Sequence, residues 1–403
     1  MRLYTTTNLT TEISANVIAR SFSAALLRIQ PNGDFPIFGI TGLGKTKKIG
    51  STSHSYYSKT AVFPQVTLDG AIADGVTTSF TVDDSSPLKI GSVLLVYKVT
   101  TGTYTAPELV RVTAIPDATT LTVTRGVGGT TGAAIADNTV LFEVGNSYGE
   151  GSDAPTARAI AMTEHTNFTQ IFRNSWDVTR TAAAVNLEPG VELTAENKED
   201  AAFFHASAIE WATIFGRKEA TTDPATGNPM RYMDGIESII TQFAPGNVNA
   251  AGATTTFNQL EALLHPTLDY KTNRTAGNKR MLLCGATAYE TIHKIGRLSG
   301  YFELTPDSTV FGTDFVRFRT SRGNFSMMEH PLLNSNEHTK SMCIIADMSS
   351  FDYKYLTETF HTDIGFDQTG RDATSGVFTT ELTIEMMSPL SWGIIYNLVA
   401  AAA

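Results

Sequence analysis

Residues 167–185 read NFTQIFRNSWDVTRTAAAV and alternate between apolar and polar side chains over most of their length. Phe168, Phe172, Trp176 and Val178 occupy even positions, whereas Arg173 and other polar residues occupy most odd ones. This period of two predicts a long β-strand with one apolar face. Because no tight-turn sequence follows it, the strand has to find its partner elsewhere in the chain or in another chain.

The composition is that of a globular protein of about two or three domains, as expected for 403 residues. Charged residues make up 17% of the chain, below the usual value of about 25%, and Thr, Ala, Gly and Ser take their place. This deficit favours extensive subunit interfaces, with a Thr-rich β protein as the alternative. The net charge is −10 and no basic run is longer than Lys47-Lys48, which argues against a protein that binds nucleic acid through a basic surface.

The two cysteines and the first residues bear on the cellular compartment. Cys284 and Cys343 lie in the apolar stretches MLLCGA and SMCIIA, which favours buried free thiols over a disulfide and fits synthesis in the cytosol. The sequence MRLYTTTNLT lacks the apolar core of a secretory signal, and no uncharged apolar stretch reaches 18 residues. We therefore expect no export by a secretory signal and no membrane partner.

Two regions in the N-terminal part of the chain have different sequence patterns and predict different secondary structure. Residues 12–30, EISANVIARSFSAALLRIQ, predict an amphipathic helix that ends at the turn sequence PNGD. Residues 66–146 contain five short β runs separated by Gly and Asp turns, at spacings typical of small sandwiches and barrels. Because loop tips tolerate insertions best, we interpret residues 66–146 as an all-β domain inserted into a projecting loop.

The strongest helix prediction covers residues 194–216, TAENKEDAAFFHASAIEWATIFG. Thr194 is the expected N-cap, acidic residues in the first turns suit the positive end of the helix dipole, and Gly216 is a natural stop. The apolar residues that recur at helical spacing, and so predict the buried face, are Ala201, Phe204, Ala208, Trp211 and Phe215.

The rest of the chain predicts an α+β domain followed by a long hairpin. Residues 236–350 mix helical stretches such as FNQLEALLHPTL with strand-like stretches such as RMLLCG and SMCIIADM. Within residues 352–388, KYLTETFHTDIGF and VFTTELTIEMM predict two long strands joined by the charged loop DQTGRDATSG.

One stretch satisfies a nucleotide-binding pattern. GITGLGKT, Gly39 to Thr46, fits the phosphate-binding loop G-x-x-x-x-G-K-[ST]. That loop needs a buried strand before it and a helix after it. Pro36 interrupts the preceding stretch, and KKIGSTSHSYYSK has no helical apolar stripe. A segment of a basic arm is the favoured interpretation, and a nucleotide-binding protein is kept as the alternative.

No other pattern predicts catalysis, a metal or a cofactor. The eight histidines form no H-E-x-x-H motif, and the chain has no G-x-S-x-G elbow and no signature Cys nucleophile. The loop DQTGRDATSG lacks the spacing of an EF-hand. We therefore expect a protein that is not an enzyme and that uses no cofactor.

The order of these pieces resembles the major capsid proteins of tailed phages, which share the Hong Kong 97-type fold. The match rests on HSYYSKT, TLTVTRGVGGTTGAAIAD, EGSDAPTARAIAMTEHTNFTQIFRNSWDVTRTA and the helix at 194–216, and it covers nearly the whole chain. Within the family, the chain resembles the group with a small β domain inserted in the extended loop.

The resemblance implies an α+β, Hong Kong 97-like capsid fold. Its parts would be an N-terminal arm (1–50), an extended loop (51–65 and 147–185), the inserted β-barrel or sandwich (66–146), a peripheral domain with the spine helix (186–235 and 351–390), an axial domain (236–350) and a C-terminal tail (391–403).

The resemblance also implies where subunits meet. The strand at 167–180 would pair with 51–62, and the resulting extended loop would lie over a neighbouring subunit. Its expected intersubunit contacts are Tyr56, Tyr57, Phe168, Phe172, Arg173, Trp176 and Asp177. The loop at 367–375 would meet its copies at three-fold contacts through Asp367, Arg371 and Asp372.

The implied function is structural. Hexamers and pentamers of the chain would form the icosahedral capsid around double-stranded phage DNA, which they would enclose without sequence-specific binding. Portal, scaffold, maturation protease and decoration proteins are the partners that the resemblance suggests. The protein would reside in the virion after assembly in the host cytoplasm. A cell-surface β protein, which would need an export signal, is the third hypothesis.

Overall fold

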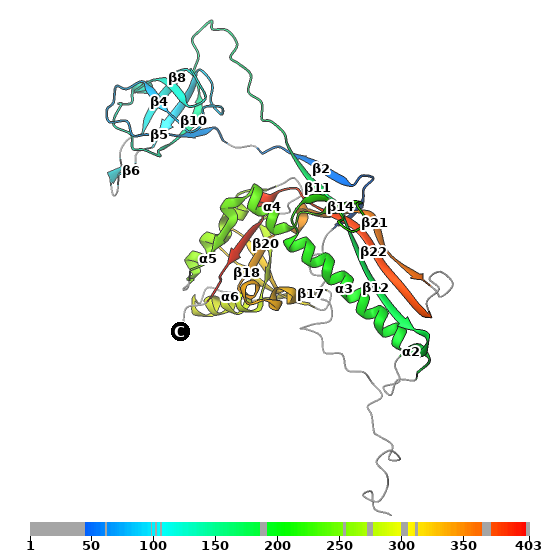
Figure 1. Cartoon of the computed structure of the whole chain (residues 1–403). Coiled ribbons are helices and arrows are strands. Elements are labelled where there is room, and N and C mark those ends of the chain that lie inside the picture. Colours follow the sequence, from blue (N-terminus) through cyan, green and yellow to red (C-terminus); the bar gives the residue numbers. More distant parts are fainter. Residues whose placement is uncertain are drawn as a thin grey trace, which may run out of the picture. The chain divides into compact units, whose positions relative to one another are not determined.

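The computed structural model describes residues 45–399 apart from 61–62, 98, 101–102, 105–106, 186–191, 253–254, 272–276, 300–304, 311–312 and 365–371. The chain divides into two compact units, one made of Met1–Ser58 and Glu164–Ala403 and the other of Lys59–Thr163 (Figure 1). The helix predicted at 12–30 lies outside the described residues. Helices and sheets are combined in the first unit, as the α+β fold class requires.

A long helix lies on a four-stranded sheet in the first unit, and we call the two together the peripheral part because they overlap the predicted peripheral domain (Figure 1). The helix is α3 (Leu193–Phe215), which lies along β12 and β22. The sheet follows the order β1 (Lys45–Lys48), β21 (Phe351–Ile364), β22 (Ala373–Met386) and β12 (Gln170–Thr179). The long hairpin predicted near the C-terminus is therefore confirmed as the antiparallel pair β21 and β22.

The strand predicted within residues 167–185 is divided between two sheets. β11 (Thr163–Phe168) pairs with β2 (Ser53–Ser58), whereas β12 pairs with β22. Phe172 lies opposite Thr380, and Trp176 lies opposite Gly376. The prediction that residues 167–180 pair with 51–62 is therefore wrong beyond Phe168, because the hairpin of the chain itself supplies the partner strand.

Helix α3 ends where the sequence predicted and begins slightly earlier. Its N-cap is Glu192, whose side chain makes no capping bond, and not Thr194. At the other end Gly216 permits a close backbone approach. A Cβ at this position would lie 2.5 Å from the Ala212 carbonyl oxygen and 2.6 Å from that of Met233. Any larger residue would therefore force the helix end away from the following loop.

The buried face of α3 differs from the predicted one. The helix buries Ala201, His205, Ala206, Ile209, Glu210, Thr213 and Ile214. Phe204, which was expected in the core, is 60% exposed, and Trp211 is half-buried. The helix therefore carries apolar residues outside its buried face, and the sequence period alone could not tell which face meets the sheet.

The other large sheet of the first unit is a seven-stranded mixed sheet, which we call the axial part because most of it falls within the predicted axial domain. Its order is β15 (Val248–Ala250), β23 (Gly393–Tyr396), β20 (Cys343–Ala346), β16 (Lys279–Cys284), β19 (Asn324–Glu329), β18 (Thr313–Arg319) and β17 (Thr305–Val310). The expected C-terminal tail at 391–403 is corrected, because β23 pairs with two strands of this sheet. Trp392 is fully buried, which explains why the end of the chain is apolar.

Short helices and one small hairpin complete the first unit. They are α2 (Arg180–Ala184), α4 (Ile236–Phe243), α5 (Phe257–Leu264), α6 (Ala286–Ser299), α7 (Glu337–Lys340), and the hairpin of β13 (Glu219–Thr222) and β14 (Pro229–Tyr232). Thr256 and Gln259 form a capping box at the start of α5. Cys284 and Cys343 are buried free thiols on adjacent strands, with 3.3 Å between their Sγ atoms.

The second unit is a small β-barrel. Its strands are β3 (Gln65–Thr67), β10 (Val140–Asn146), β5 (Ser92–Val96), β8 (Glu108–Ala114), β9 (Thr120–Thr124) and β4 (Ser79–Thr81), beside the hairpin of β6 (Val99–Thr100) and β7 (Thr103–Tyr104). A bridge between Leu68 and Val82 joins the two outer strands and closes the barrel. Inside, the Arg125 guanidinium contacts the buried Glu108 carboxylate at 2.6 Å.

Candidate assembly surfaces

A row of buried charges fastens the root of the extended loop, strands β2 and β11, to the peripheral sheet. Glu385 of β22 lies 2.7 Å from His54 Nε2 of β2 and 2.7 Å from Lys354 Nζ of β21. Lys354 also contacts Asp352 at 3.1 Å. The Lys354 ammonium group thus forms close ion pairs with two buried carboxylates, those of Asp352 and Glu385. The loop root therefore has a fixed position on the sheet.

Two polar side chains mark the point where β11 ends and β12 begins. The Asn167 amide donates to the carbonyl oxygens of Asp234, at 3.1 Å, and Ile384, at 3.2 Å. The Thr169 hydroxyl lies 2.6 Å from a carboxylate oxygen of Glu381. These bonds hold the chain at the point where it passes from one sheet to the other.

The two tyrosines predicted to contact a neighbour have different roles in the structure. The Tyr56 hydroxyl donates to the carbonyl oxygen of Met386, and its ring stacks on His165 with 4.9 Å between centroids. Burial raises the pKa of the Tyr56 phenol well above its usual range, and the Glu385 charge adds to this rise. Tyr56 is thus an internal anchor, whereas Tyr57 is 66% exposed.

The apolar face of β12 belongs to the core of its own chain. Phe172 is 6% exposed and joins the cluster around α3, α4 and β22, whereas Phe168 is half-buried. Trp176 is 5% exposed, and its indole N–H donates to His361 Nε2 at 2.9 Å. The expectation that a neighbouring subunit covers Phe172 and Trp176 is therefore wrong, because α3 and the hairpin already cover them.

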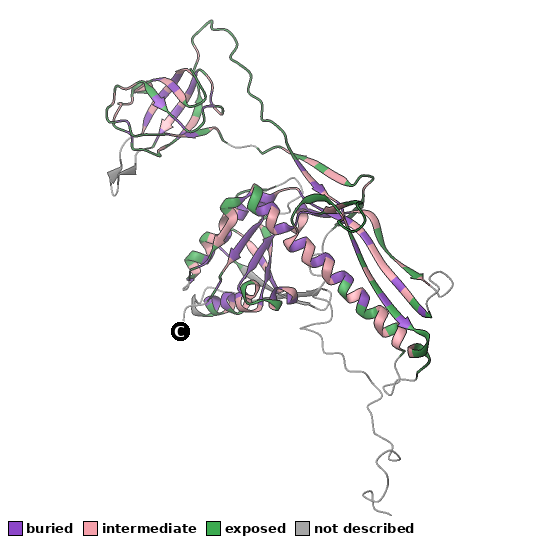
Figure 2. Cartoon of the chain, in the orientation of Figure 1, coloured by how far each residue is buried: buried purple, intermediate pink, exposed green. Residues whose placement is uncertain are grey.

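Exposed residues alternate with buried ones along β12, and the exposed ones form the opposite face of the same sheet (Figure 2). Arg173 and Phe360 both lie opposite Thr379 and so share this outer face with Ile171 and Asp177. Ile171 is 53% exposed and Phe360 is 46% exposed, and Arg173 and Asp177 are exposed as well. Large apolar side chains beside charged ones on an exposed sheet face are typical of protein–protein contact surfaces.

At the far end of the hairpin, Asp372 makes an exposed ion pair. The Arg180 Nε donates to Asp372 Oδ1 at 2.5 Å, and the Arg180 amide donates to the Asp372 carbonyl oxygen at 3.2 Å. This pair joins the start of α2 to the start of β22. Asp367 and Arg371, the other two predicted contacts, lie outside the described residues.

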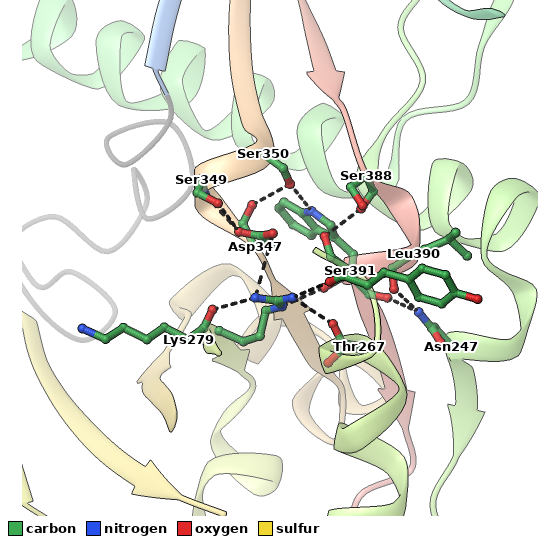
Figure 3. Close-up of polar contacts among 12 residues, drawn as sticks. Asn247, Thr267, Lys279, Asp347, Ser349, Ser350, Ser388, Leu390 and Ser391 are labelled. Atoms are coloured by element: carbon green, nitrogen blue, oxygen red, sulfur yellow. Dashed lines mark hydrogen bonds and ion pairs between the residues drawn. The ribbon is translucent and has the colours of Figure 1, made fainter. Parts of the chain in front are cut away.

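The joint between the axial and peripheral parts is built around a buried arginine (Figure 3). Arg280 of β16 donates to the carbonyl oxygens of Ser391 at 3.1 Å, Thr267 at 2.9 Å and Tyr270 at 3.1 Å. Its Nη1 lies 3.9 Å from an Asp347 carboxylate oxygen. Burial lowers the pKa of Arg280, and the Asp347 charge opposes this shift.

A second polar group at this joint holds the last strand. The Asn247 amide donates to the carbonyl oxygens of Leu390, at 2.9 Å, and Trp392, at 2.7 Å. The Trp392 indole N–H lies 3.2 Å from Ser350 Oγ, just before β21 begins. The hairpin strands that leave the axial part are thus fixed at their base (Figure 3).

The nucleotide-binding alternative finds no support. Lys45 and Thr46, the last residues of the predicted phosphate loop, are exposed residues of strand β1 and pair with Asp352 and Tyr353. A phosphate loop needs these two residues at the start of a helix. Within the described part of the chain, no group of His, Cys, Asp and Glu could hold a metal ion. No described helix has the length and apolar character needed to cross a membrane.

Sequence reasoning missed Arg280 and the row of charges that contains Glu385. Arg280 is the second residue of an ordinary strand, KRMLLC, and its acceptors are backbone carbonyls outside that strand, in the segment just before it and at Ser391. Glu385 lies in the stretch VFTTELTIEMM, whose period of two puts it on the face opposite Leu382 and Ile384, yet it is 3% exposed. For both residues, the only sign in the sequence is a charged side chain beside an apolar stretch. That sign does not identify the group with which the charge interacts.

Comparison with known proteins agrees with this architecture. The family described as SU10 major capsid protein matches residues 4–399. The major capsid protein of Pseudomonas phage PaMx41 is 30% identical over 396 residues, which span 94% of this chain and 92% of the relative.

Solved structures of low identity are also similar. The chain of Mycobacterium phage Ogopogo has a TM-score of 0.48 at 10% identity, with 97% of this chain and 99% of the other covered. The capsid of a native GTA particle gives a TM-score of 0.47 at 8% identity, with 98% and 100% covered. The match to the family and the relative in phage PaMx41 confirm the resemblance that the sequence suggested. The chain therefore belongs to the SU10 major capsid protein family and forms the capsid shell of a phage.

Proposed function

We propose that this major capsid protein assembles as hexamers and pentamers into a closed icosahedral shell around double-stranded DNA. The observation that carries the proposal is the outer face of the peripheral sheet. Ile171 and Phe360 are 53% and 46% exposed there, although the inner face of the same sheet is fully packed. A protein that stays monomeric rarely exposes large apolar side chains together on one face.

Several surfaces of the protomer are available for such contacts at the same time. We assign the extended loop to one neighbour through Tyr57 and Phe168, and the outer sheet face to another through Ile171, Arg173 and Asp177. Each contact can be weak, because a subunit that joins several neighbours gains stability from geometry and multivalency.

The end of the hairpin is the third proposed contact. Asp367, Arg371 and Asp372 carry both signs of charge within a few residues. Copies that meet around a three-fold axis could therefore pair an acid of one subunit with the arginine of the next. Such exposed pairs contribute specificity and correct orientation more than affinity.

The charge of the chain fits a container for DNA. A net charge of −10 repels phosphate, so the shell would enclose the genome without binding it tightly. Portal, scaffold, maturation protease and decoration proteins are further partners that we propose from the family relationship, with assembly in the host cytoplasm. The barrel, Lys59–Thr163, is the unit that we assign to decoration partners or to neighbouring barrels.

Electron microscopy of the purified full-length protein tests the proposal. We expect the wild type to form closed shells at high concentration. Ile171→Asp should prevent shell formation while its thermal unfolding midpoint stays at the wild-type value, because the side chain is exposed in the protomer. Ile171→Val keeps an apolar surface and should still assemble. Normal shells formed by Ile171→Asp would contradict the assigned role of the outer face.

A further inference from the structure

The spine helix α3 carries apolar side chains outside the face that packs on its own sheet. Phe204 and Trp211 lie two helical turns apart on one side of the helix, next to Ala208 and Phe215, which pack partly buried against the core of the chain. Phe204 is 60% exposed, and its ring meets that of Phe203 edge to face at 5.8 Å. We call Phe203, Phe204 and Trp211 the spine stripe.

The spine stripe is an unusual surface for a helix of a protomer in water. The rings of Trp211 and Phe215 lie 5.4 Å apart, and Phe215 packs against the core, so the stripe extends from Phe203 and Phe204 to the half-buried Trp211. Removing an aromatic side chain from water is favourable, so a covered stripe is more stable than an exposed one. A second amphipathic helix is the element that covers such a stripe, through side chains spaced three and four residues apart.

We propose that residues 12–30 of the same chain bind the spine stripe as an amphipathic helix. The sequence EISANVIARSFSAALLRIQ predicts such a helix and offers Ile18, Phe22 and Ile29 at matching spacing. Its 19 residues would span about 28 Å, which is close to the length of about 34 Å expected for the 23 residues of α3. The two helices could therefore pack along most of their lengths.

The place where the described chain begins brings this segment to α3. Strand β1 starts at Lys45, and Thr46 pairs with Tyr353. The Tyr353 hydroxyl donates to Thr213 Oγ1 of α3 at 3.2 Å, so the chain enters the peripheral sheet beside a strand that contacts the spine helix directly. The connection at 31–44 has 14 residues and can span up to about 50 Å, enough to reach any turn of α3.

Charge complements the apolar match. The first turns of α3 carry Glu196, Glu199 and Asp200 against a single Lys198. Residues 12–30 carry Arg20 and Arg28 against a single glutamate. Opposite charge at the two ends of the contact favours one orientation of the segment over the other. A second copy of the chain or a separate partner would offer no comparable link to β1.

Crosslinking within the unassembled full-length protein tests the proposal independently of shell formation. A dilute Ala25→Cys/Asp200→Cys variant, which leaves Phe22 and Phe204 in place, should give an intrachain crosslink in most molecules when it is treated with a short bismaleimide. Ala25→Cys/Ser175→Cys is the matched control, because Ser175 is exposed on the outer face of the sheet. Equal crosslinking in both variants, or crosslinks only between chains, would overturn the proposal.

Limited trypsin digestion gives a second readout that needs no crosslinker. Binding should protect the bonds after Arg20 and Arg28, and Phe204→Asp should speed their cleavage by about tenfold, because protease cuts the open form. Ile171→Asp, the same kind of change at an exposed residue on the outer face of the sheet, should leave the cleavage rate unchanged. Wild-type protein that is cut as fast as Phe204→Asp would also overturn the proposal.

Discussion

Replacing Trp176 by alanine should destabilise the protomer itself, rather than only its contacts with neighbours. The side chain is 5% exposed, its ring is parallel to that of His361 at 6.0 Å between centroids, and its N–H donates to His361 Nε2 at 2.9 Å. Truncating a buried aromatic residue to alanine costs about 3–5 kcal/mol of unfolding free energy, because a cavity remains. We expect Trp176→Ala to lie in this range.

Two further variants divide this effect into its components. Trp176→Phe keeps most of the apolar contact but removes the hydrogen bond, which should cost about 0.5–1.5 kcal/mol plus the cost of the smaller ring. Arg173→Ala changes the same strand on its exposed face and should cost less than about 0.5 kcal/mol.

Urea unfolding of dilute, unassembled protein, followed by near-ultraviolet circular dichroism, measures all three variants against the wild type. Among the three variants, Arg173→Ala should unfold at the highest urea concentration, Trp176→Phe at a lower one and Trp176→Ala at the lowest. A Trp176→Ala protein that is as stable as Arg173→Ala but fails to assemble would refute the reasoning. Trp176 would then be an intersubunit residue after all.

Four other predictions concern the interior. Arg280→Met removes a buried guanidinium that donates to the carbonyls of Ser391, Thr267 and Tyr270, so the unfolding free energy should fall by about 3–5 kcal/mol, measured by thermal unfolding beside the exposed control Lys279→Met. Gly216→Ala should lower the unfolding midpoint as well, because its Cβ would lie 2.5 Å from a carbonyl oxygen. Burial lowers the pKa of His205, so the folded state favours the neutral imidazole. Stability should therefore be lost as the pH falls below about 6.5, and His205→Gln should flatten this dependence. Arg125→Met should speed amide hydrogen exchange in the barrel loop at 74–77, whose carbonyls this arginine holds.

The sequence period identified the elements better than their partners. The alternation in residues 167–185 predicted a strand correctly, and β12 has that strand's apolar face. Alternation states which side chains share a face, but it says nothing about what covers that face. The assignment of Phe172 and Trp176 to a neighbouring subunit is therefore wrong, because the hairpin and α3 of the same chain bury them.

The same reasoning explains the other corrections. Helix α3 carries apolar residues outside its buried face, and a helical period cannot tell which face meets the sheet, so the prediction that Phe204 lies in the core is wrong. The shortness of residues 391–403 suggests a tail, yet β23 fills a position between two strands of the axial sheet. Long-range pairing of this kind depends on contacts that no local pattern encodes.

The polar side chains that hold the backbone could not be predicted from the sequence for a different reason. Arg280 and Asn247 act on backbone carbonyls, and every residue has a carbonyl, so the acceptor leaves no mark in the sequence. The five strands predicted for residues 66–146 overlap β4, β5, β8, β9 and β10, because local alternation and turns suffice to define a small barrel.

A cryo-electron microscopy reconstruction of particles assembled from the purified chain tests the central claim most directly. Closed shells in which a neighbouring subunit covers Ile171 and Phe360, while Trp176 stays in the core of its own chain, are the predicted result. Particles in which water covers the outer sheet face, or a protein that stays monomeric at high concentration, would contradict the account.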